Sequence, residues 1–198
     1  MTEAKLQRRF RPPGSELLPL YAGYYVAELL WELTDHYDAH PLLFDAADRC
    51  LVLLAEGREV RPLIFRFELT ALRLLGHVPS LSRCVECGQP VEPAARIPFG
   101  PLAGGVLCGR CRPGKRHVVS LSKEAWSAMR RFADPADDAW QAEPLPAGVG
   151  GELRGAMNYY LSHLVGHLLK MLPYLGHEGT RGSATSRSDN PAPTTKNP

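Results

Sequence analysis

Two Cys-x-x-Cys pairs constrain this chain more than any other feature of its sequence. Cys84 and Cys87 form the first pair, Cys108 and Cys111 form the second, and 20 residues separate the pairs. Two intervening residues let one tight turn aim both sulfurs at a single ion, and two such turns facing each other close a tetrahedral site. Gly88 follows the first pair and can adopt the left-handed backbone angle that such a turn often needs. The spacing therefore predicts a four-cysteine metal module.

The chemistry of four thiolates favours zinc, Zn²⁺, and makes the site structural. Four cysteine ligands leave no coordination position open for a substrate. Iron, a pair of disulfides and unrelated free thiols are the alternatives. The first residues contain no apolar run typical of a signal peptide, and a reducing cytosol disfavours disulfides. The fifth cysteine, Cys50, lies in an apolar helical pattern and is expected to be a small core residue.

The overall composition excludes a membrane protein and says little else about partners. The chain has 198 residues and a formal net charge of +2, so total charge alone gives no argument for nucleic-acid binding. No apolar run approaches the roughly 18 residues that a membrane span requires. We therefore expect a cytoplasmic protein of one or two small domains, with no membrane segment.

Apolar residues at helical spacing predict a mainly α protein. The expected helices cover residues 15–39, 41–57, 59–75, 122–132 and about 152–175. The third is apolar nearly all round, which predicts a central position in a bundle. Ser122 is expected to cap the fourth helix. Residues 134–151 are expected to form a loop, and the segment between the cysteine pairs reads as a basic, proline-rich loop with short strands at 106–107 and 117–119.

These expectations define a helical bundle with an inserted four-cysteine zinc ribbon that contributes a small β element. Residues 15–175 form the helical domain, and residues 81–119 form the ribbon within it. Residues 1–14 are basic and proline-bearing and read as a linker or remnant. Residues 176–198 are almost free of apolar side chains and predict a disordered tail.

Basic residues gather at three places and form the candidate contacts to DNA phosphates. Cations beside four thiolates on zinc also favour thiolate formation, so a structural role and a DNA role both remain open for the group nearest the cysteines. Solvated surface is the alternative for the other two groups. The candidates are Arg110, Arg112, Lys115 and Arg116 beside the ribbon, Lys123, Arg130 and Arg131 on the fourth helix, and Arg8, Arg9 and Arg11 near the start.

The sequence contains no catalytic motif. No Ser-His-Asp order, phosphate loop or paired carboxylates can be recognised, and Asp35, His36 and Asp38 are expected to form a helix end. His163 and His167 stand four residues apart, but the glutamate of a metalloprotease helix does not lie between them. They are expected to be packing residues, and the protein is expected not to be an enzyme.

The order of several motifs resembles the bacterial recombination mediator family RecO. These motifs are Phe67-Glu68-Leu69 leading to Leu74-Leu75-Gly76, the run from Leu81 to Gly88, Gly104-Gly105-Val106-Leu107-Cys108, and a last helix with His163-Leu164 and Leu168-Leu169-Lys170. The resemblance implies an OB-fold, a helical domain and a zinc ribbon. It also implies binding of single- and double-stranded DNA, and action with RecR and single-stranded DNA-binding protein to load RecA. The family places its OB-fold before the point that matches residues 5–14, so either the start is truncated or misassigned, or this domain is absent.

The resemblance further implies binding of the acidic, apolar C-terminal tail of single-stranded DNA-binding protein. Such a tail needs an apolar slot for its terminal aromatic residue and a cation for its carboxylate. The last helix is expected to offer both, through Leu164, His167, Leu168 and Lys170, and the fourth helix with Arg130 and Arg131 is the alternative. A zinc-stabilised helical adaptor that contacts only proteins is the competing interpretation of the whole chain.

Overall fold

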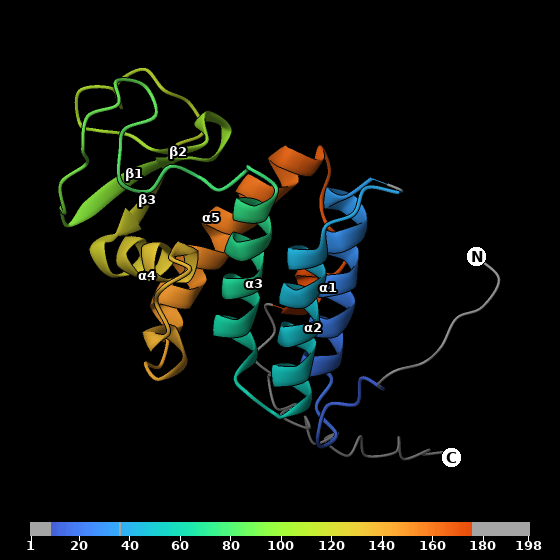
Figure 1. Ribbon diagram of the computed structural model, residues 1–198. Coiled ribbons are helices and arrows are strands. Elements are labelled where there is room, and N and C mark those ends of the chain that lie inside the picture. The colour runs from blue at the N-terminus through green and yellow to red at the C-terminus, as the bar shows by residue number, and fades with distance from the viewer. Residues whose placement is uncertain (1–8, 36, 176–198) are drawn as a thin grey trace, which may run out of the picture.

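The computed structural model describes residues 9–35 and 37–175 and shows a helical bundle that carries a small sheet at one end (Figure 1). This arrangement confirms the expected fold class. The elements in chain order are α1 (Leu18–Leu33), α2 (Pro41–Ala55), α3 (Val60–Leu74), β1 (Arg96–Gly100), η1 (Pro101–Ala103), β2 (Gly105–Val106), β3 (Val119–Ser122), α4 (Lys123–Ala133), η2 (Ala139–Gln141), α5 (Ala147–Val165) and α6 (Leu172–Leu175).

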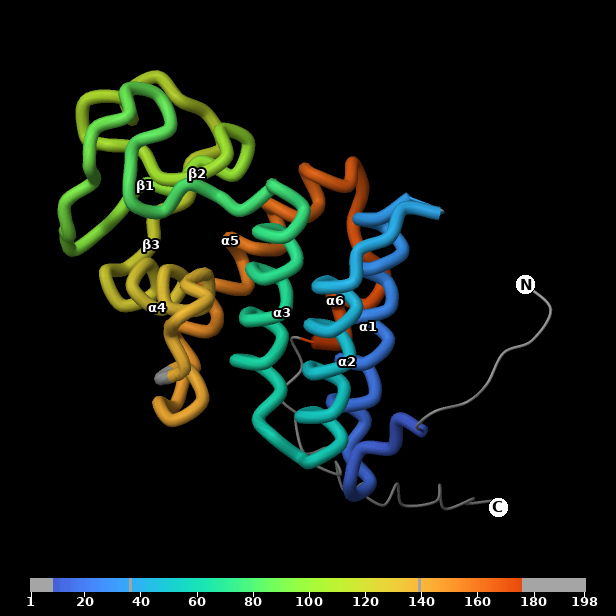
Figure 2. Tube along the Cα trace, in the orientation of Figure 1, coloured from blue at the N-terminus to red at the C-terminus, as the bar shows by residue number. Residues whose placement is uncertain are grey.

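Helix α3 occupies the centre of the bundle, as its sequence predicts. Figure 2 shows it between the α1–α2 pair on one side and α4 with α5 on the other. Its side chains are buried around most of the helix circumference, including Leu63, Phe67 and Leu72. Because a helix that is apolar on several faces must be covered on several faces, the neighbouring helices pack around it. None of the described helices is long and apolar enough to cross a membrane.

The ribbon contains a three-stranded antiparallel sheet in the order β2-β1-β3. Its central strand, β1, lies where the sequence predicted a loop, so that expectation is wrong. Ile97 and Phe99 alternate with polar or smaller positions and are buried, and Phe99 packs against Tyr160 of α5 with ring centroids 6.2 Å apart. Pro98 between them hid the alternating pattern because proline is a weak strand former. The last strand also begins later than predicted, because His117 has a left-handed φ of 57°.

Helix α1 is shorter than predicted, and helix α5 is shifted. Leu17 stands at the N-cap position without a side-chain cap, and α1 begins at Leu18 with Pro19 in its first turn. The glycines at 148, 150 and 151 lie inside the first turns of α5, although the sequence predicted a loop there. Helix α5 then ends at Val165 because Gly166 takes a φ of +88°. The expected continuous helix to residue 175 is therefore wrong, and a turn leads instead into α6.

Helix α1 holds the turn after α5 in place. The carboxylate of Glu28 accepts hydrogen bonds from the backbone N–H groups of Lys170, at 2.6 Å, and Met171, at 2.9 Å. His163 therefore lies on α5 and His167 lies beyond its end, so the two do not share a helix face. Arg8, His36 and the expected tail at 176–198 lie outside the described residues.

Candidate metal centre and basic surfaces

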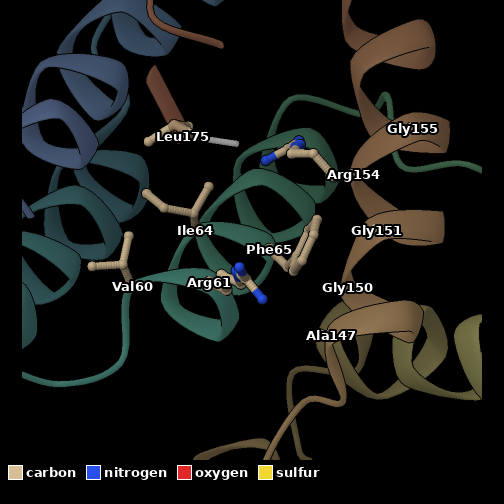
Figure 3. A pocket seen from close by; sticks show the side chains of 10 residues that line it. All are labelled: Val60, Arg61, Ile64, Phe65, Ala147, Gly150, Gly151, Arg154, Gly155 and Leu175. Carbon is tan, nitrogen blue, oxygen red and sulfur yellow. The ribbon is translucent and has the colours of Figure 1, made fainter. Parts of the chain in front are cut away.

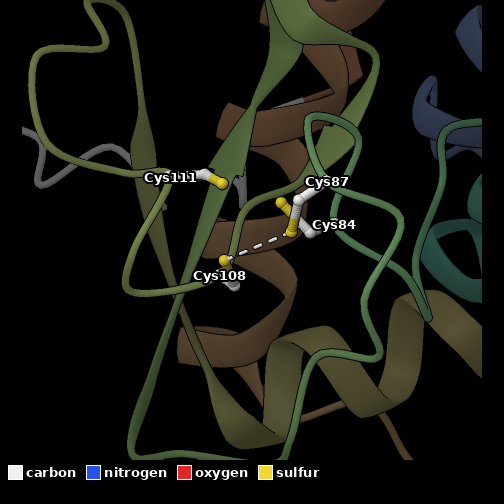
Figure 4. A group of neighbouring side chains, drawn as sticks. All are labelled: Cys84, Cys87, Cys108 and Cys111. Carbon is white, nitrogen blue, oxygen red and sulfur yellow. Dashed lines mark hydrogen bonds between the residues drawn. The ribbon is translucent and has the colours of Figure 1, made fainter.

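The four predicted cysteines converge at one point of the ribbon (Figure 4). The sulfur atoms of Cys84, Cys87, Cys108 and Cys111 all lie within 4.8 Å of one another. The Sγ atoms of Cys87 and Cys108 are 3.8 Å apart. Zn–S bonds of about 2.3 Å place the sulfurs of a regular tetrahedron roughly 3.8 Å apart. All four cysteines are free thiols, so this donor set fits a metal ion and not a pair of disulfides.

Each cysteine pair sits on a hydrogen-bonded turn. In the first, the Gly88 N–H donates to the Cys84 carbonyl at 2.9 Å, and the Cys84 N–H donates to Gln89 at 2.8 Å. Gly88 has the left-handed φ, 70°, that its position predicted. In the second, the Cys108 carbonyl accepts from the N–H groups of Cys111 and Arg112, at 3.1 and 3.0 Å. The backbone of each turn therefore brings its two sulfurs together, and a metal ion would join the two turns.

The environment of the sulfurs favours thiolates, but not four of them without a cation. Burial opposes ionisation of Cys84, yet hydrogen bonds from the backbone N–H groups of Cys108, Cys87 and Glu86 outweigh it and lower the pKa to about 6. Hydrogen bonds from the Cys111 thiol to Cys108 and Cys87 raise the pKa of Cys111 to about 12. A bound divalent cation would remove this conflict, because metal binding displaces the thiol protons.

The ribbon is anchored to the bundle on both sides of the metal centre. The indole N–H of Trp126 on α4 donates to the Leu81 carbonyl at 2.8 Å. On α5, Glu152 accepts from the Ser122 N–H at 2.6 Å and pairs with Arg96 at 3.4 Å. The hydrogen bond from the Ser122 backbone is the main reason that the pKa of Glu152 is lowered. Ribbon and helices therefore form one packed unit.

The ribbon cations are exposed within the second cysteine pair and in the residues that directly follow it. Lys115 forms an ion pair with Glu86 at 2.6 Å. This group, which we call the basic turn, consists of Arg110, Arg112, Lys115 and Arg116, and all four side chains are exposed. Their exposure suits contact with a large polyanion, whereas neutralising the thiolates would require them to fold back on the metal centre.

The other predicted DNA contacts are dispersed. Arg130 stacks on Trp126 with its guanidinium carbon 4.8 Å from the ring centre, and Arg131 pairs with Glu143. Both line a hollow of about 460 Å³ beside Leu81 and Ser82, next to the ribbon. Lys123 is exposed at the start of α4. In contrast, Arg9 and Arg11 flank Phe10 at the end of the bundle that lies away from the ribbon (Figure 1). The structure does not bring this last pair together with the others.

The residues expected to take a partner tail do not form a slot on one helix. Leu164 is half-buried on α5, while His167, Leu168 and Lys170 lie in the turn that follows. His167 Nε2 lies 3.1 Å from Glu32 of α1, so this part of the turn is held by an ion pair. The helical periodicity that grouped these side chains is interrupted at Gly166.

A pocket that sequence reasoning missed lies between α3 and α5 (Figure 3). It has a volume of about 370 Å³. Val60, Ile64 and Phe65 of α3 form an apolar wall, Leu175 closes one side, and glycines of α5 keep the other wall low. Figure 3 shows the nitrogen atoms of Arg61 and Arg154 facing the space between the helices. We call this the α3–α5 pocket.

Arg154 belongs to a buried polar network behind this pocket. Its Nη2 donates to Oε1 of Glu68 at 2.6 Å, and the Tyr25 hydroxyl donates to the same oxygen. Glu68 is completely buried, and Arg154 is also packed over the ring of Phe65, 4.9 Å from its centre. Burial, followed by the charge of Glu68, raises the pKa of Tyr25 well above its usual value. Glu68 is the one acidic residue of helix 60–74 and stands among its apolar core positions, and this was the signal for such a partner.

Comparison with known proteins identifies what this chain is similar to. A family model described as "Recombination protein O C terminal" matches residues 14–173. The DNA repair protein RecO of Rhodopirellula baltica is 35% identical, over 88% of this chain and 73% of the relative. The DNA repair protein RecO of Anaeromyxobacter dehalogenans strain 2CP-C is 37% identical, over 78% of this chain and 61% of the relative. That of Myxococcus xanthus is 30% identical, over 86% and 67%. The matches therefore span between 61% and 73% of the length of these relatives.

Proposed function

Because this chain belongs to the RecO family of recombination proteins, we propose that it is a DNA-repair and homologous-recombination mediator. It binds DNA without chemical turnover and helps to load the recombinase RecA on single-stranded DNA, together with RecR and single-stranded DNA-binding protein. The family match over residues 14–173 carries this proposal, because it covers the bundle and the ribbon together. Relatives named as DNA repair proteins support it, and we place the protein in the cytoplasm, where the DNA lies.

Zn²⁺ is the metal that we assign to the four cysteines. The mutual sulfur distances, up to 4.8 Å, suit a tetrahedral ion, and an all-thiolate set suits zinc. When bound, zinc supplies charge neutralisation and a cross-link between the two turns. The residues around it do the rest, since the basic turn extends directly from Cys111 and would be held in place by the same cross-link.

DNA binding by the basic turn is testable through its salt dependence. Replacing Arg112 and Arg116 with alanine should weaken binding of single-stranded DNA of every sequence. Each phosphate contact that forms releases counterions, so binding by the variant releases fewer of them. The slope of log affinity against log salt should therefore fall in magnitude by about 1.4 for two lost contacts. The comparison with the same loss of charge is Arg9→Ala with Arg11→Ala, which tests the candidate group at the opposite end of the bundle. An unchanged slope in the ribbon variant, measured by fluorescence anisotropy, would exclude the basic turn from the DNA contact.

The α3–α5 pocket is our candidate site for the tail of single-stranded DNA-binding protein. The pocket combines an apolar wall at Ile64 and Phe65 with the guanidinium groups of Arg61 and Arg154. This is the combination that a C-terminal aromatic residue and its carboxylate require. A labelled tail peptide should bind at low salt, and it should lose affinity when its terminal carboxylate is amidated.

Two substitutions separate this pocket from the site expected from the sequence. Ile64→Ser and Arg61→Ala should each weaken the peptide, whereas Leu168→Ser with Lys170→Ala, in the turn after α5, should not. Equal losses in both sets, or binding that ignores amidation, would argue against the α3–α5 pocket. Circular dichroism must show an unchanged helical signal in each variant.

An adaptor that contacts only proteins is the second candidate function, and one surface favours it. Helix α1 carries exposed Leu17, Tyr24 and Trp31, with Leu20 and Ala27 between them, along a single stripe opposite its core face. Apolar stripes of this kind typically mark contacts with other proteins. Saturable DNA binding that weakens with salt favours the mediator, whereas binding of RecR without any binding of DNA favours the adaptor.

A further inference from the structure

A hollow between α2, α3 and η2 lies apart from the metal centre and from the α3–α5 pocket. Its volume is about 220 Å³. Arg49 of α2 and Arg66 and Arg73 of α3 line it, and Asp138 and Trp140 complete its wall. Three guanidinium groups therefore surround this small space with one carboxylate among the lining residues. We call it the arginine hollow.

The three arginines of the hollow lack ion-pair partners among the described carboxylates. Arg66 uses its nitrogens to hold backbone carbonyls, among them those of Phe132 at 3.1 Å and Pro135 at 3.2 Å. Within residues 9–35 and 37–175, neither Arg49 nor Arg73 has a carboxylate within ion-pair distance. Burial, followed by repulsion from Arg73, lowers the pKa of Arg66. The charges of Asp138, Asp137 and Asp134 oppose this shift, but none of the three carboxylates forms an ion pair with Arg49 or Arg73.

Two nitrogen atoms in the wall also lack a hydrogen-bond acceptor. Arg73 Nη1 and the indole Nε1 of Trp140 are shielded from solvent, and neither finds a partner in the described part of the chain. A buried donor without an acceptor is unfavourable, so such groups point to a missing water or ion. Both belong to residues that line the hollow.

The floor of the hollow is neutral and rigid. Cys50, Leu53 and Phe67 form it, and all three are buried. Burial raises the pKa of the Cys50 thiol to about 12, so no thiolate competes with an incoming anion. Thr70 adds a hydroxyl group beside the arginines.

We propose that the arginine hollow binds a phosphate group. A tetrahedral anion with several acceptor oxygens suits guanidinium groups that approach from two helices. The volume decides the size of the occupant: pockets for drug-sized ligands span roughly 300–1,000 Å³, whereas this hollow of about 220 Å³ suits a small group. The inference goes beyond the proposed function, because a free phosphate ion would bind here without DNA or partner proteins.

Titration calorimetry with inorganic phosphate at constant ionic strength tests the site. Arg49→Gln and Arg73→Gln should each weaken phosphate binding roughly tenfold, because each removes a charge-assisted hydrogen bond. Trp140→Phe keeps an aromatic side chain and removes the donor, and it should weaken binding about threefold or more. Arg58→Gln is the matched control, because this exposed arginine on the α2–α3 turn lines a neighbouring hollow but not this one.

The outcomes decide the proposal even if one variant folds poorly. Arg49 is exposed, so Arg49→Gln should keep the helical circular dichroism of the parent protein. Absence of saturable phosphate binding to the parent protein, or equal binding by Arg49→Gln, Trp140→Phe and Arg58→Gln, would overturn the site. Loss in the first two variants with retention in the control upholds it.

The source of the phosphate group is resolved by a second comparison. The parent protein and Arg49→Gln are compared on one oligonucleotide with and without a 5′-phosphate, and on a nucleoside 5′-monophosphate. A preference for the phosphorylated end that disappears in Arg49→Gln assigns the site to nucleic-acid ends. Equal affinity for both oligonucleotides, with Arg49-dependent binding of the monophosphate, assigns it to free phosphate compounds. If Arg49→Gln changes the binding of none of these three ligands, the proposal is contradicted. That result would leave the DNA affinity conferred by the basic turn unaffected.

Discussion

Glu68 and Arg154 form a charged pair that is almost completely enclosed in the bundle. Glu68 has no exposed surface, the Arg154 side chain is 16% exposed, and Tyr25 adds a hydroxyl to the same carboxylate. Enclosed pairs often add little net stability, but the loss of one partner strands the other charge. The pair is therefore better understood as a device that fixes where α3 and α5 meet than as a source of stability.

Replacement of one partner or both should reveal this asymmetry. Arg154→Met should lower the free energy of unfolding by roughly 3–5 kcal/mol, because Glu68 would stay buried without a counter-charge. Adding Glu68→Leu to that variant should restore part of the loss. Urea unfolding of the parent, both single variants and the double variant measures the coupling. Strictly additive costs would show that the two side chains do not act as a pair.

His167 provides a pH-dependent contact between α1 and the turn after α5. Its hydrogen bond to the Leu168 carbonyl, followed by that to Glu32, raises its pKa above 6.5. A raised pKa means that the ion pair contributes fully at pH values below the unfolded pKa, and that its contribution is lost as pH rises through the folded pKa. An NMR titration should find the pKa of His167 raised in the parent protein and lower in Glu32→Gln than in the parent.

At the scale of elements, the approach of β2 to the linker after α3 depends on Gly105. A Cβ atom at this position would lie 2.3 Å from the Ser80 carbonyl oxygen, which is backbone and cannot turn aside. Gly105 also has a φ of +155°, at the edge of the range that glycine favours. Two hydrogen bonds, Ser80 N–H to Gly104 and Val106 N–H to Ser80, hold the segments together at 2.9 and 2.8 Å.

Gly105→Ala should therefore separate the first cysteine turn from the sheet. The two hydrogen bonds are worth about 1 kcal/mol each, so we expect a loss of roughly 2 kcal/mol or more in thermal or urea unfolding. Gly109→Ala is the control in the same module, because a Cβ at that position meets open space. Equal effects of the two substitutions would contradict the role assigned to this close approach.

Periodicity predicted the elements well where one pattern ran without interruption. Helix α3 and the Pro41 start of α2 follow directly from the sequence. Strand β1 did not follow from the sequence, because Pro98 and its neighbours have the composition of a loop. The segment is a strand because β2 and β3 pair with it on both sides. The start of α5 was missed because glycine disfavours helices locally, and tertiary packing of α5 against α4 and β3 overrides that preference.

At the scale of the whole molecule, the sequence predicted the metal centre and missed the pockets. Cysteine spacing encodes the centre locally, since each pair lies on one turn. The α3–α5 pocket and the arginine hollow combine side chains from different helices, such as Arg61 with Arg154 and Arg49 with Arg73. Sequence periodicity describes single helices, so it gives no account of the space between two of them.

Removal of the metal should unfold the ribbon and spare most of the bundle. Cys87→Ser or Cys108→Ser should lower the zinc content of the purified protein from one to near zero per chain, since structural zinc contributes roughly 10–16 kcal/mol to small modules. Far-UV circular dichroism should retain most of its helical signal. Cys50→Ala is the control, because this thiol is buried between α2 and α3 and should leave zinc content unchanged. A full complement of zinc in either serine variant would contradict the four-cysteine centre.

The hydrogen bonds of Arg66 have a consequence for local unfolding of the protein. Anchored on α3, it donates to the carbonyls of Arg131, Phe132, Asp134 and Pro135 at the end of α4. The last turn of α4 therefore cannot unfold without breaking its hydrogen bonds to Arg66, a side chain of the central helix α3. Amide hydrogens of that turn should exchange with deuterium at rates closer to those of α3 than to those of an ordinary helix end. One long side chain thus joins two helices into a single unit of opening.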